Sequence, residues 1–165
     1  MKEAPKRLAQ KKREARVKTF DDLLIELYER LRGDPADAES RAQAERLAES
    51  IRSAFSVVLV DEFQDTDPIQ YAVIKRLFLR KREPHPVWFV GDPKQAIYRF
   101  RGADLETYLR ARRDVEALYQ TAGSGRFRGV YALTTNYRSS PDLVRAFNAF
   151  WRTAPNPFLR DDPSL

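Results

Sequence analysis

The sequence predicts an α/β fold in which helices alternate with the strands of a parallel sheet. Three short apolar runs carry this prediction, at residues 57–60, 87–90 and 130–134, with helical patterns between them. A strand that is followed by a helix and then by another strand needs a crossover connection, which favours parallel pairing. The runs VVLV and VWFV contain no polar residue, so these two strands are expected to be buried on both faces.

The helices before the first strand are predicted by capping signals and by the spacing of apolar residues. Thr19 and Asp22 form a helix-start pattern, and leucines follow at helical spacing until Gly33 and Pro35 end the helix. A second helix, rich in alanine, glutamate and arginine, is expected over about residues 36–54.

Two later helices are marked by proline at their first position. Asp67-Pro68 and Ser140-Pro141 each place a capping side chain directly before a proline. Between these two helices, a third is expected over about residues 104–119.

Composition restricts the class of protein. The chain has 165 residues, no cysteine and one histidine, so it has neither a disulfide framework nor a thiolate metal site, and a zinc site is disfavoured. No apolar run approaches the roughly 20 residues of a membrane span, and the charged amino terminus differs from a signal peptide. The expected compartment is the cytoplasm. Trp88 and Trp151 fall on apolar stripes and are expected in the core, whereas His85 is expected in a solvated loop.

The net charge of +6 is concentrated at one end of the chain. Residues 1–18 hold eight Lys or Arg and two Asp or Glu, and the remaining residues carry 22 charges of each sign. The composition supports a solvated basic helix or tail here at least as well as an arm that binds DNA.

Two acidic residues, Asp61 and Glu62, follow the first predicted strand directly. Ligands of open parallel sheets bind at the carboxyl ends of the strands, so functional groups are expected here. One carboxylate can hold Mg²⁺ through water, and the other can orient or deprotonate a water that attacks a γ-phosphate. Strands also often end in acidic turn residues, and the pair by itself favours that simpler alternative.

A fourteen-residue string, GDPKQAIYRFRGAD, follows the second predicted strand. Gln95 supplies an amide, which can donate to a phosphate or accept from a water without adding charge. Tyr98 and Phe100 alternate with Arg99 and Arg101. Aromatic rings that stack on bases, beside arginines that neutralise phosphates, suit single-stranded DNA. In isolation, these four residues would be expected to be core anchors and solvated charges.

The third predicted strand is followed by the tetrapeptide NYRS, which contains Tyr137 and Arg138. With DEFQDT at residues 61–66 and the fourteen-residue string, it resembles motifs II, III and IV of the UvrD/Rep-type superfamily 1 DNA helicases, in the family's order. The likeness covers most of the chain from about residue 19 onward. It implies a RecA-like motor domain of the P-loop NTPase class, ATP and Mg²⁺ as cofactors, and DNA as partner.

The resemblance also implies roles for individual residues in catalysis. Asp61 would be the Mg²⁺ ligand and Glu62 the catalytic base. Gln95 would sense the γ-phosphate, and Arg138 would stabilise transition-state charge there as an arginine finger.

Further residues are implied in nucleotide and DNA binding. Gln64, with Asp65, would couple the nucleotide to the second motif of this chain, and Tyr137 would pack on the adenine. In the family, the aromatic positions of the fourteen-residue string form base-stacking pockets, which here implies Tyr98 and Phe100, with Arg99 and Arg101 interleaved.

The flanking residues favour the RecB-type branch, the beta subunits of exodeoxyribonuclease V. DEFQDTDPIQY and NYRSSPDLV carry this narrower likeness. It implies a 3′-to-5′ helicase within a helicase-nuclease that acts on single strands and duplex ends in double-strand-break repair and recombination, together with other subunits. AddA-type and UvrD-type helicases remain alternatives.

The sequence contains no G-x-x-x-x-G-K-[ST] loop, because none of its six glycines is followed by lysine. That loop supplies the phosphate-binding N–H groups, a lysine and a Mg²⁺-binding hydroxyl. Motifs V and VI and the nuclease domain are absent too.

The expected organisation is a basic lead-in at 1–18, a partial motor domain at 19–153 and an irregular tail at 154–165. Such a fragment is expected not to hydrolyse ATP alone, and a non-catalytic remnant that binds DNA or a subunit is the alternative.

Overall fold

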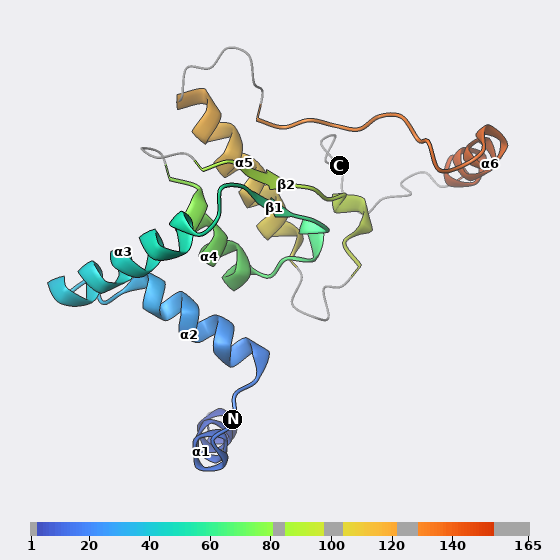
Figure 1. Ribbon diagram of the computed structural model, residues 1–165. Helices are drawn as coiled ribbons and strands as arrows, with labels where there is room; N and C mark the ends of the chain where they lie inside the picture. The colour runs from blue at the N-terminus through green and yellow to red at the C-terminus, as the bar shows by residue number, and fades with distance from the viewer. Residues whose placement is uncertain (1–2, 81–84, 98–103, 122–128, 154–165) are drawn as a thin grey trace.

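The computed structural model describes residues 3–80, 85–97, 104–121 and 129–153 (Figure 1). Its elements are, in chain order, α1 (Glu3–Ala15), α2 (Phe20–Arg32), α3 (Ala38–Ser53), β1 (Val58–Val60), the 3₁₀ helix η1 (Phe63–Asp65), α4 (Pro68–Phe78), β2 (Val87–Phe89), the 3₁₀ helix η2 (Pro93–Gln95), α5 (Leu105–Thr121) and α6 (Pro141–Trp151). A parallel strand pair with helices confirms the α/β class in part, and the complete RecA-like domain remains a proposal. None of the described helices is both long and apolar enough to cross a membrane.

Capping side chains start the helices where the sequence predicted them. Asp22 N donates to Thr19 Oγ1 at 3.4 Å, and Thr19 N donates to Asp22 Oδ2 at 2.8 Å, which completes a capping box at the start of α2. Asp67 and Gln70 form the same arrangement at the start of α4. Gly33 ends α2 with a φ of 66°, a conformation that favours glycine.

β1 and β2 pair in parallel, with Val60 opposite Phe89, and α4 connects them. Val60 and Phe89 lie on the face that the helices cover. The other face is open, since Leu59 and Trp88 lie opposite each other and are 65% and 59% exposed. The prediction that both faces are buried and that Trp88 is in the core is therefore wrong. Alternate residues of a strand point to opposite faces, and the described helices cover only one of them.

The core lies between the covered face of the sheet and helices α2 to α5. One cluster joins α2, α3 and α4, and its buried members are Leu31, Ala48, Val73, Leu77 and Phe78. A second cluster lies toward the carboxyl ends of the strands, and its buried members are Phe63, Tyr71 and Ala111. The ring of His85 is partly buried, with its centroid 5.2 Å from that of Phe78, so the prediction of a solvated histidine is also wrong.

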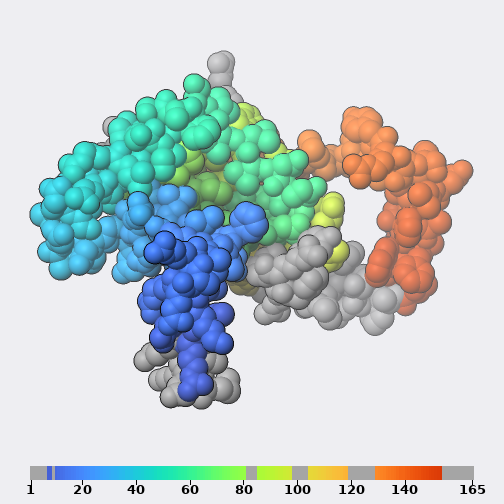
Figure 2. Space-filling model, turned by 60° about the horizontal axis from the view of Figure 1, so that its bottom comes forward, coloured from blue at the N-terminus to red at the C-terminus, as the bar shows by residue number. Residues whose placement is uncertain are grey.

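Residues 130–134 form no strand, contrary to the prediction. This segment pairs with neither β1 nor β2, and Tyr131 and Leu133 are 65% and 97% exposed. Figures 1 and 2 show it leading away from the sheet to α6, which stands apart from the other helices. α6 begins after the Ser140 cap as predicted, but Trp151 is 44% exposed rather than in the core. A strand needs a hydrogen-bonded neighbour, and none of the described residues supplies one here.

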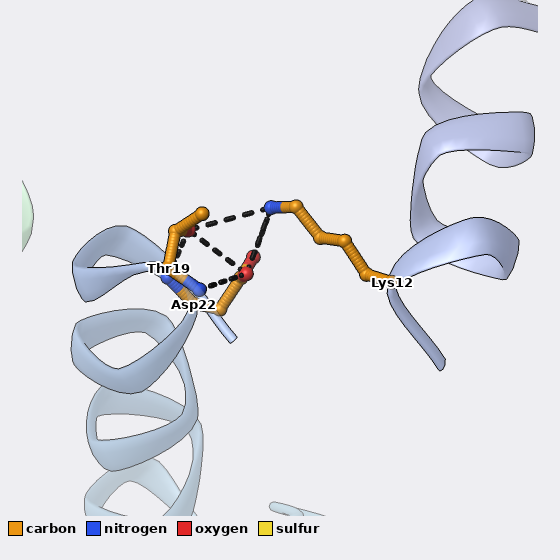
Figure 3. Close-up of polar contacts among 3 residues, drawn as sticks. All are labelled: Lys12, Thr19 and Asp22. Carbon is orange, nitrogen blue, oxygen red and sulfur yellow. Dashed lines mark hydrogen bonds and ion pairs between the residues drawn. The ribbon is translucent and has the colours of Figure 1, made fainter. Parts of the chain in front are cut away.

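Lys12 connects α1 to the start of α2 (Figure 3). Its Nζ lies 2.9 and 2.7 Å from the two carboxylate oxygens of Asp22 and 3.3 Å from Thr19 Oγ1. The pKa of Asp22 is lowered to about 2, chiefly by the hydrogen bond from Lys12 and then by those from the backbone and hydroxyl of Thr19. The basic lead-in is thus a helix whose last turn is joined to α2 by an ion pair.

We expect the contacts of Asp22 to persist in moderately acidic solution. The pKa is depressed below its ordinary value of 3.8, so the stabilisation is complete above about pH 4 and is lost as the pH falls through about 2. In Lys12→Met the midpoint should rise toward 3.8, because the largest cause of the shift is removed. Carboxyl ¹³C NMR titration measures both midpoints, and an equally low midpoint in the variant would contradict this account.

Candidate active site

The loops that follow β1 and β2 lie side by side at the carboxyl ends of the strands. Backbone pairing continues past the strands, because Val90 N donates to Val60 O at 2.9 Å and Phe63 N donates to Val90 O at 2.9 Å. The residues after Val60 therefore stand beside those after Val90, and the first two predicted motifs meet at the edge where parallel sheets bind ligands.

The first loop exposes two carboxylates, those of Asp61 and Glu62. Oδ1 of Asp61 accepts the backbone N–H of Glu62 at 2.9 Å. Glu62 has a left-handed backbone, with φ 49° and ψ 42°, which costs on the order of 1–2 kcal/mol in a residue other than glycine. η1 then turns the chain inward, where Phe63 is 2% exposed. The acid pair is thus held at the surface by a sharp turn that is anchored in the core.

Gln64, which is 3% exposed, joins the two loops. Its Nε2 donates to Oε2 of Glu62 at 2.6 Å, and its Oε1 accepts the backbone N–H of Asp92 at 3.0 Å. The amide orientation is fixed by its partners, because a carboxylate only accepts and a backbone N–H only donates. Gly91 permits this approach, since a Cβ there would lie 2.6 Å from Gln64 Oε1 and 3.0 Å from Phe63 N.

Asp92 organises the second loop by capping η2. Its Oδ1 accepts the backbone N–H of Lys94 at 3.0 Å, and its Oδ2 accepts Nε2 of Gln95 at 3.0 Å. The Gln95 side chain extends from an exposed residue. One series of hydrogen bonds therefore runs from Glu62 through Gln64 and Asp92 to Gln95.

Aromatic rings support both loops, with Phe63 buried and Phe89 and Tyr108 partly buried. The centroid of the Phe63 ring lies 4.4 Å from that of Phe89 and 5.9 Å from that of Tyr108. The Tyr108 hydroxyl, on α5, donates to the carbonyl oxygen of Gly91 at 3.4 Å. Burial raises the pKa of Tyr108, which keeps this hydroxyl protonated as a donor. The same cluster thus holds the first loop by packing and the second by a hydrogen bond.

A polar contact fixes α5 against α4. Oδ2 of Asp114 accepts the Tyr71 hydroxyl at 2.5 Å and the Lys75 ammonium at 2.6 Å. Burial, followed by the contact with Asp114, raises the pKa of Tyr71. Burial alone would raise the pKa of Asp114, but the hydrogen bonds from Lys75 and Tyr71 outweigh it and lower this pKa. An ionised Asp114 therefore joins the two helices that carry the aromatic support.

The donor groups of the first loop fit Mg²⁺. In nucleotide sites this ion keeps several waters and takes one or two carboxylates together with phosphate oxygens. Asp61 offers an exposed carboxylate at the head of the loop. Among the described residues, no group of three or more His, Cys, Asp or Glu could hold a metal by itself. An ion bound at Asp61 would take its other oxygens from water or from a bound ligand.

The third predicted motif is not brought to this site. Tyr137 is 93% exposed and Arg138 is exposed, and Figure 1 shows their segment apart from the β1 and β2 loops. Locally, Asn136 Oδ1 accepts the backbone N–H of Arg138 at 2.9 Å, which makes a turn before α6. Outside the described residues lie the four predicted DNA-binding residues, Tyr98, Arg99, Phe100 and Arg101.

Sequence reasoning missed three residues of this site. Asp92 could have been found, because it precedes a proline as Asp67 does, and this pattern marks a capping residue. Gly91 and Tyr108 carry no such signal, since the close approach of Gln64 and the bond to the Gly91 carbonyl exist only in the tertiary structure.

Comparison with known proteins identifies the family. A family model described as UvrD/REP helicase N-terminal domain matches residues 1–116, which include the first two motifs. RecBCD enzyme subunit RecB of Escherichia coli K12 is 38% identical over 152 residues, 92% of this chain and 11% of that protein. The RecB subunit of Haemophilus influenzae is 40% identical over 143 residues, 86% of this chain and 10% of that protein. The RecB subunit of Mycobacterium tuberculosis H37Rv is 40% identical over 147 residues, which are 89% of this chain and 11% of that protein.

The chain spans about a tenth of the length of these curated relatives. The likeness to RecB nevertheless extends over most of this chain, and the family model covers the acid pair, Gln64, Asp92 and Gln95. The chain belongs to the UvrD/REP helicase N-terminal domain family.

Proposed function

We propose that this chain is part of the first motor domain of an ATP-dependent DNA helicase of RecB type, which couples ATP hydrolysis to movement along single-stranded DNA. The observation that carries the proposal is the hydrogen-bonded junction of the two loops, which links an exposed Asp-Glu pair to an exposed glutamine. Family membership supports a helicase function, and the likeness to a subunit of the RecBCD enzyme supports an assembly with partner subunits. The proposed action on duplex ends in double-strand-break repair and recombination rests on the resemblance of the motifs to those of RecB-type helicases.

The loops supply the groups that nucleotide hydrolysis needs. A water oxygen attacks the γ-phosphorus, the bond from phosphorus to the bridging oxygen breaks, and ADP leaves with that electron pair. The proton that the water loses goes to the Glu62 carboxylate. Gln64 fixes the direction of this carboxylate by donating to its Oε2. Bound Mg²⁺, with Asp61 as protein ligand, would neutralise charge on the phosphate oxygens.

The nucleotide-binding roles of the third motif, residues 136–139, are supported by its likeness to the family motif and by its place after the first two motifs. In the proposal, Gln64 and Gln95 border the nucleotide, Tyr137 packs on the adenine, and Arg138 stabilises charge on the γ-phosphate. Because Tyr137 and Arg138 are exposed and stand apart from the two loops, residues 129–153 must approach the loops in the active helicase.

The DNA-binding roles follow from residue chemistry and from the family resemblance. Tyr98 and Phe100 would stack on bases, and Arg99 and Arg101 would neutralise phosphates, a combination that tolerates any base sequence. The 3′-to-5′ direction of movement rests on the resemblance to RecB-type helicases.

A second candidate function is a non-catalytic module that binds DNA or a partner subunit. The missing phosphate-binding loop favours this function for the chain by itself. If the full helicase that contains this segment were of AddA or UvrD type, the proposed helicase function would be the same and only its partner subunits would differ.

DNA-stimulated ATP hydrolysis tests the proposal. A helicase that carries this segment together with a phosphate-binding loop should hydrolyse ATP faster when single-stranded DNA is added, and should move 3′ to 5′. The chain alone should show no hydrolysis above background. DNA binding without any hydrolysis by the helicase would support the binding module instead. Robust hydrolysis by the chain alone, abolished by Glu62→Gln, would contradict the need for the missing loop.

A further inference from the structure

We propose that Asp92 is a positioning residue that holds Gln95 with its amide oxygen outward. In that orientation, Gln95 accepts a hydrogen bond from the attacking water and does not donate one to the γ-phosphate. This inference rests on the proposed hydrolysis and deepens it, because the chemistry of a glutamine side chain permits either role.

The orientation of the Gln95 amide follows from the group that faces it. The Gln95 side chain contacts Oδ2 of Asp92 at 3.0 Å. A carboxylate oxygen accepts hydrogen bonds and cannot donate them, so the amide nitrogen must face Asp92 and the amide oxygen must point elsewhere. Gln95 is exposed, so that oxygen can accept a hydrogen bond from water, and among the described residues none donates to it.

Asp92 is itself fixed by two contacts besides the one with Gln95. Its Oδ1 accepts the backbone N–H of Lys94 at 3.0 Å, so the carboxylate cannot rotate away without uncapping η2. Its backbone N–H donates to Gln64 Oε1 at 3.0 Å, and Gln64 is buried. The same Gln64 donates to Glu62, so the position of Gln95 is set relative to the proposed catalytic base.

The outcome is an acceptor at each end of the hydrogen-bonded series, the Glu62 carboxylate and the Gln95 amide oxygen. A water has two hydrogens to donate. When both are accepted by the protein, a lone pair on the water oxygen is left for the γ-phosphorus. An outward amide nitrogen at Gln95 would instead favour binding of the phosphate in the ground state.

Asp92→Asn reverses the amide without removing the cap. Its side-chain oxygen must keep facing Lys94 N, so its NH₂ group faces Gln95, which turns its own oxygen inward to accept. In the helicase that carries this segment, kcat should fall by roughly 10- to 100-fold, the scale of one hydrogen bond to a reacting group. Affinity for a non-hydrolysable ATP analogue should be unchanged or higher, and Tm should hold, because asparagine caps helices as well as aspartate does.

A charge-conserving exchange provides the matched rescue. Gln95→Glu alone sets two carboxylates against each other and should also lower kcat. When Gln95→Glu is combined with Asp92→Asn, the new amide at position 92 donates to one oxygen of the new carboxylate at position 95. The other oxygen of that carboxylate then points outward as an acceptor. The kcat of the double variant should therefore exceed that of either single variant, a coupling that independent effects would not produce.

Two kinetic results would overturn the inference, and one spectroscopic result would do so as well. A near-normal kcat in Asp92→Asn would mean that Asp92 only caps η2. If the fold-decrease in kcat of the double variant equalled the product of the two single decreases, the two residues would not be coupled. Failure of the proposed function differs from both, because the unmodified helicase would then show no ATP hydrolysis. The amide orientation can be tested without nucleotide, by glutamine-selective ¹⁵N NMR of this chain. Unequal solvent exchange of the two Gln95 amide protons, altered in Asp92→Asn, is expected, and identical spectra would refute it.

Discussion

Replacing Glu62 by glutamine is expected to lower kcat for ATP hydrolysis by roughly 10²- to 10⁴-fold in a helicase that carries this segment, the usual effect of removing a general base. Glutamine keeps the size of the side chain but cannot take the proton from water. Nucleotide binding should remain, because Asp61 still offers its carboxylate to Mg²⁺. Steady-state hydrolysis and equilibrium binding of an ATP analogue measure the two effects separately.

The matched control is Glu29→Gln, the same chemical change at an exposed position of α2. It should leave kcat unchanged, since surface substitutions away from a site rarely have an effect. A near-normal kcat in Glu62→Gln would show that another group takes the proton, and an equal loss in both variants would show that the assay responds to net charge.

Replacing Phe63 by alanine is expected to lower the free energy of unfolding by about 3–5 kcal/mol, the range for emptying a buried aromatic site. Phe63 is 2% exposed, and its ring contacts Phe89 and Tyr108. The loss should also loosen both loops, because Phe63 lies between the acid pair and Gln64, and Tyr108 bonds to the second loop. Chemical denaturation measures the change in stability.

Phe20→Ala is the control for this variant, because Phe20 is 91% exposed at the start of α2. Its effect on the free energy of unfolding should stay within about 0.5 kcal/mol. If Phe63→Ala proved as mild as Phe20→Ala, the aromatic cluster would not be the support of the loops.

The local elements of this protein could be predicted from the sequence, because each depends on neighbours along the chain. The helix caps at Thr19 and Asp67 and the glycine stop at Gly33 all occur where their patterns predicted. The placement of Asp61 and Glu62 after the first strand followed from the apolar run before them. The family motifs could be recognised in the sequence for the same reason, because each is a contiguous run of residues.

The tertiary structure decided which segments pair and which faces are covered. Trp88 and the run at 130–134 have the composition of core and strand, yet Trp88 lies on the open face and the run has no partner strand among the described residues. Composition reports what a side chain prefers, whereas burial depends on whether another element reaches it. The hydrogen-bonded series from Glu62 to Gln95 was likewise decided by folding. Its central bond joins Gln64 to Asp92, which lie 28 positions apart in the sequence, and only the parallel pairing of the two strands brings their loops together.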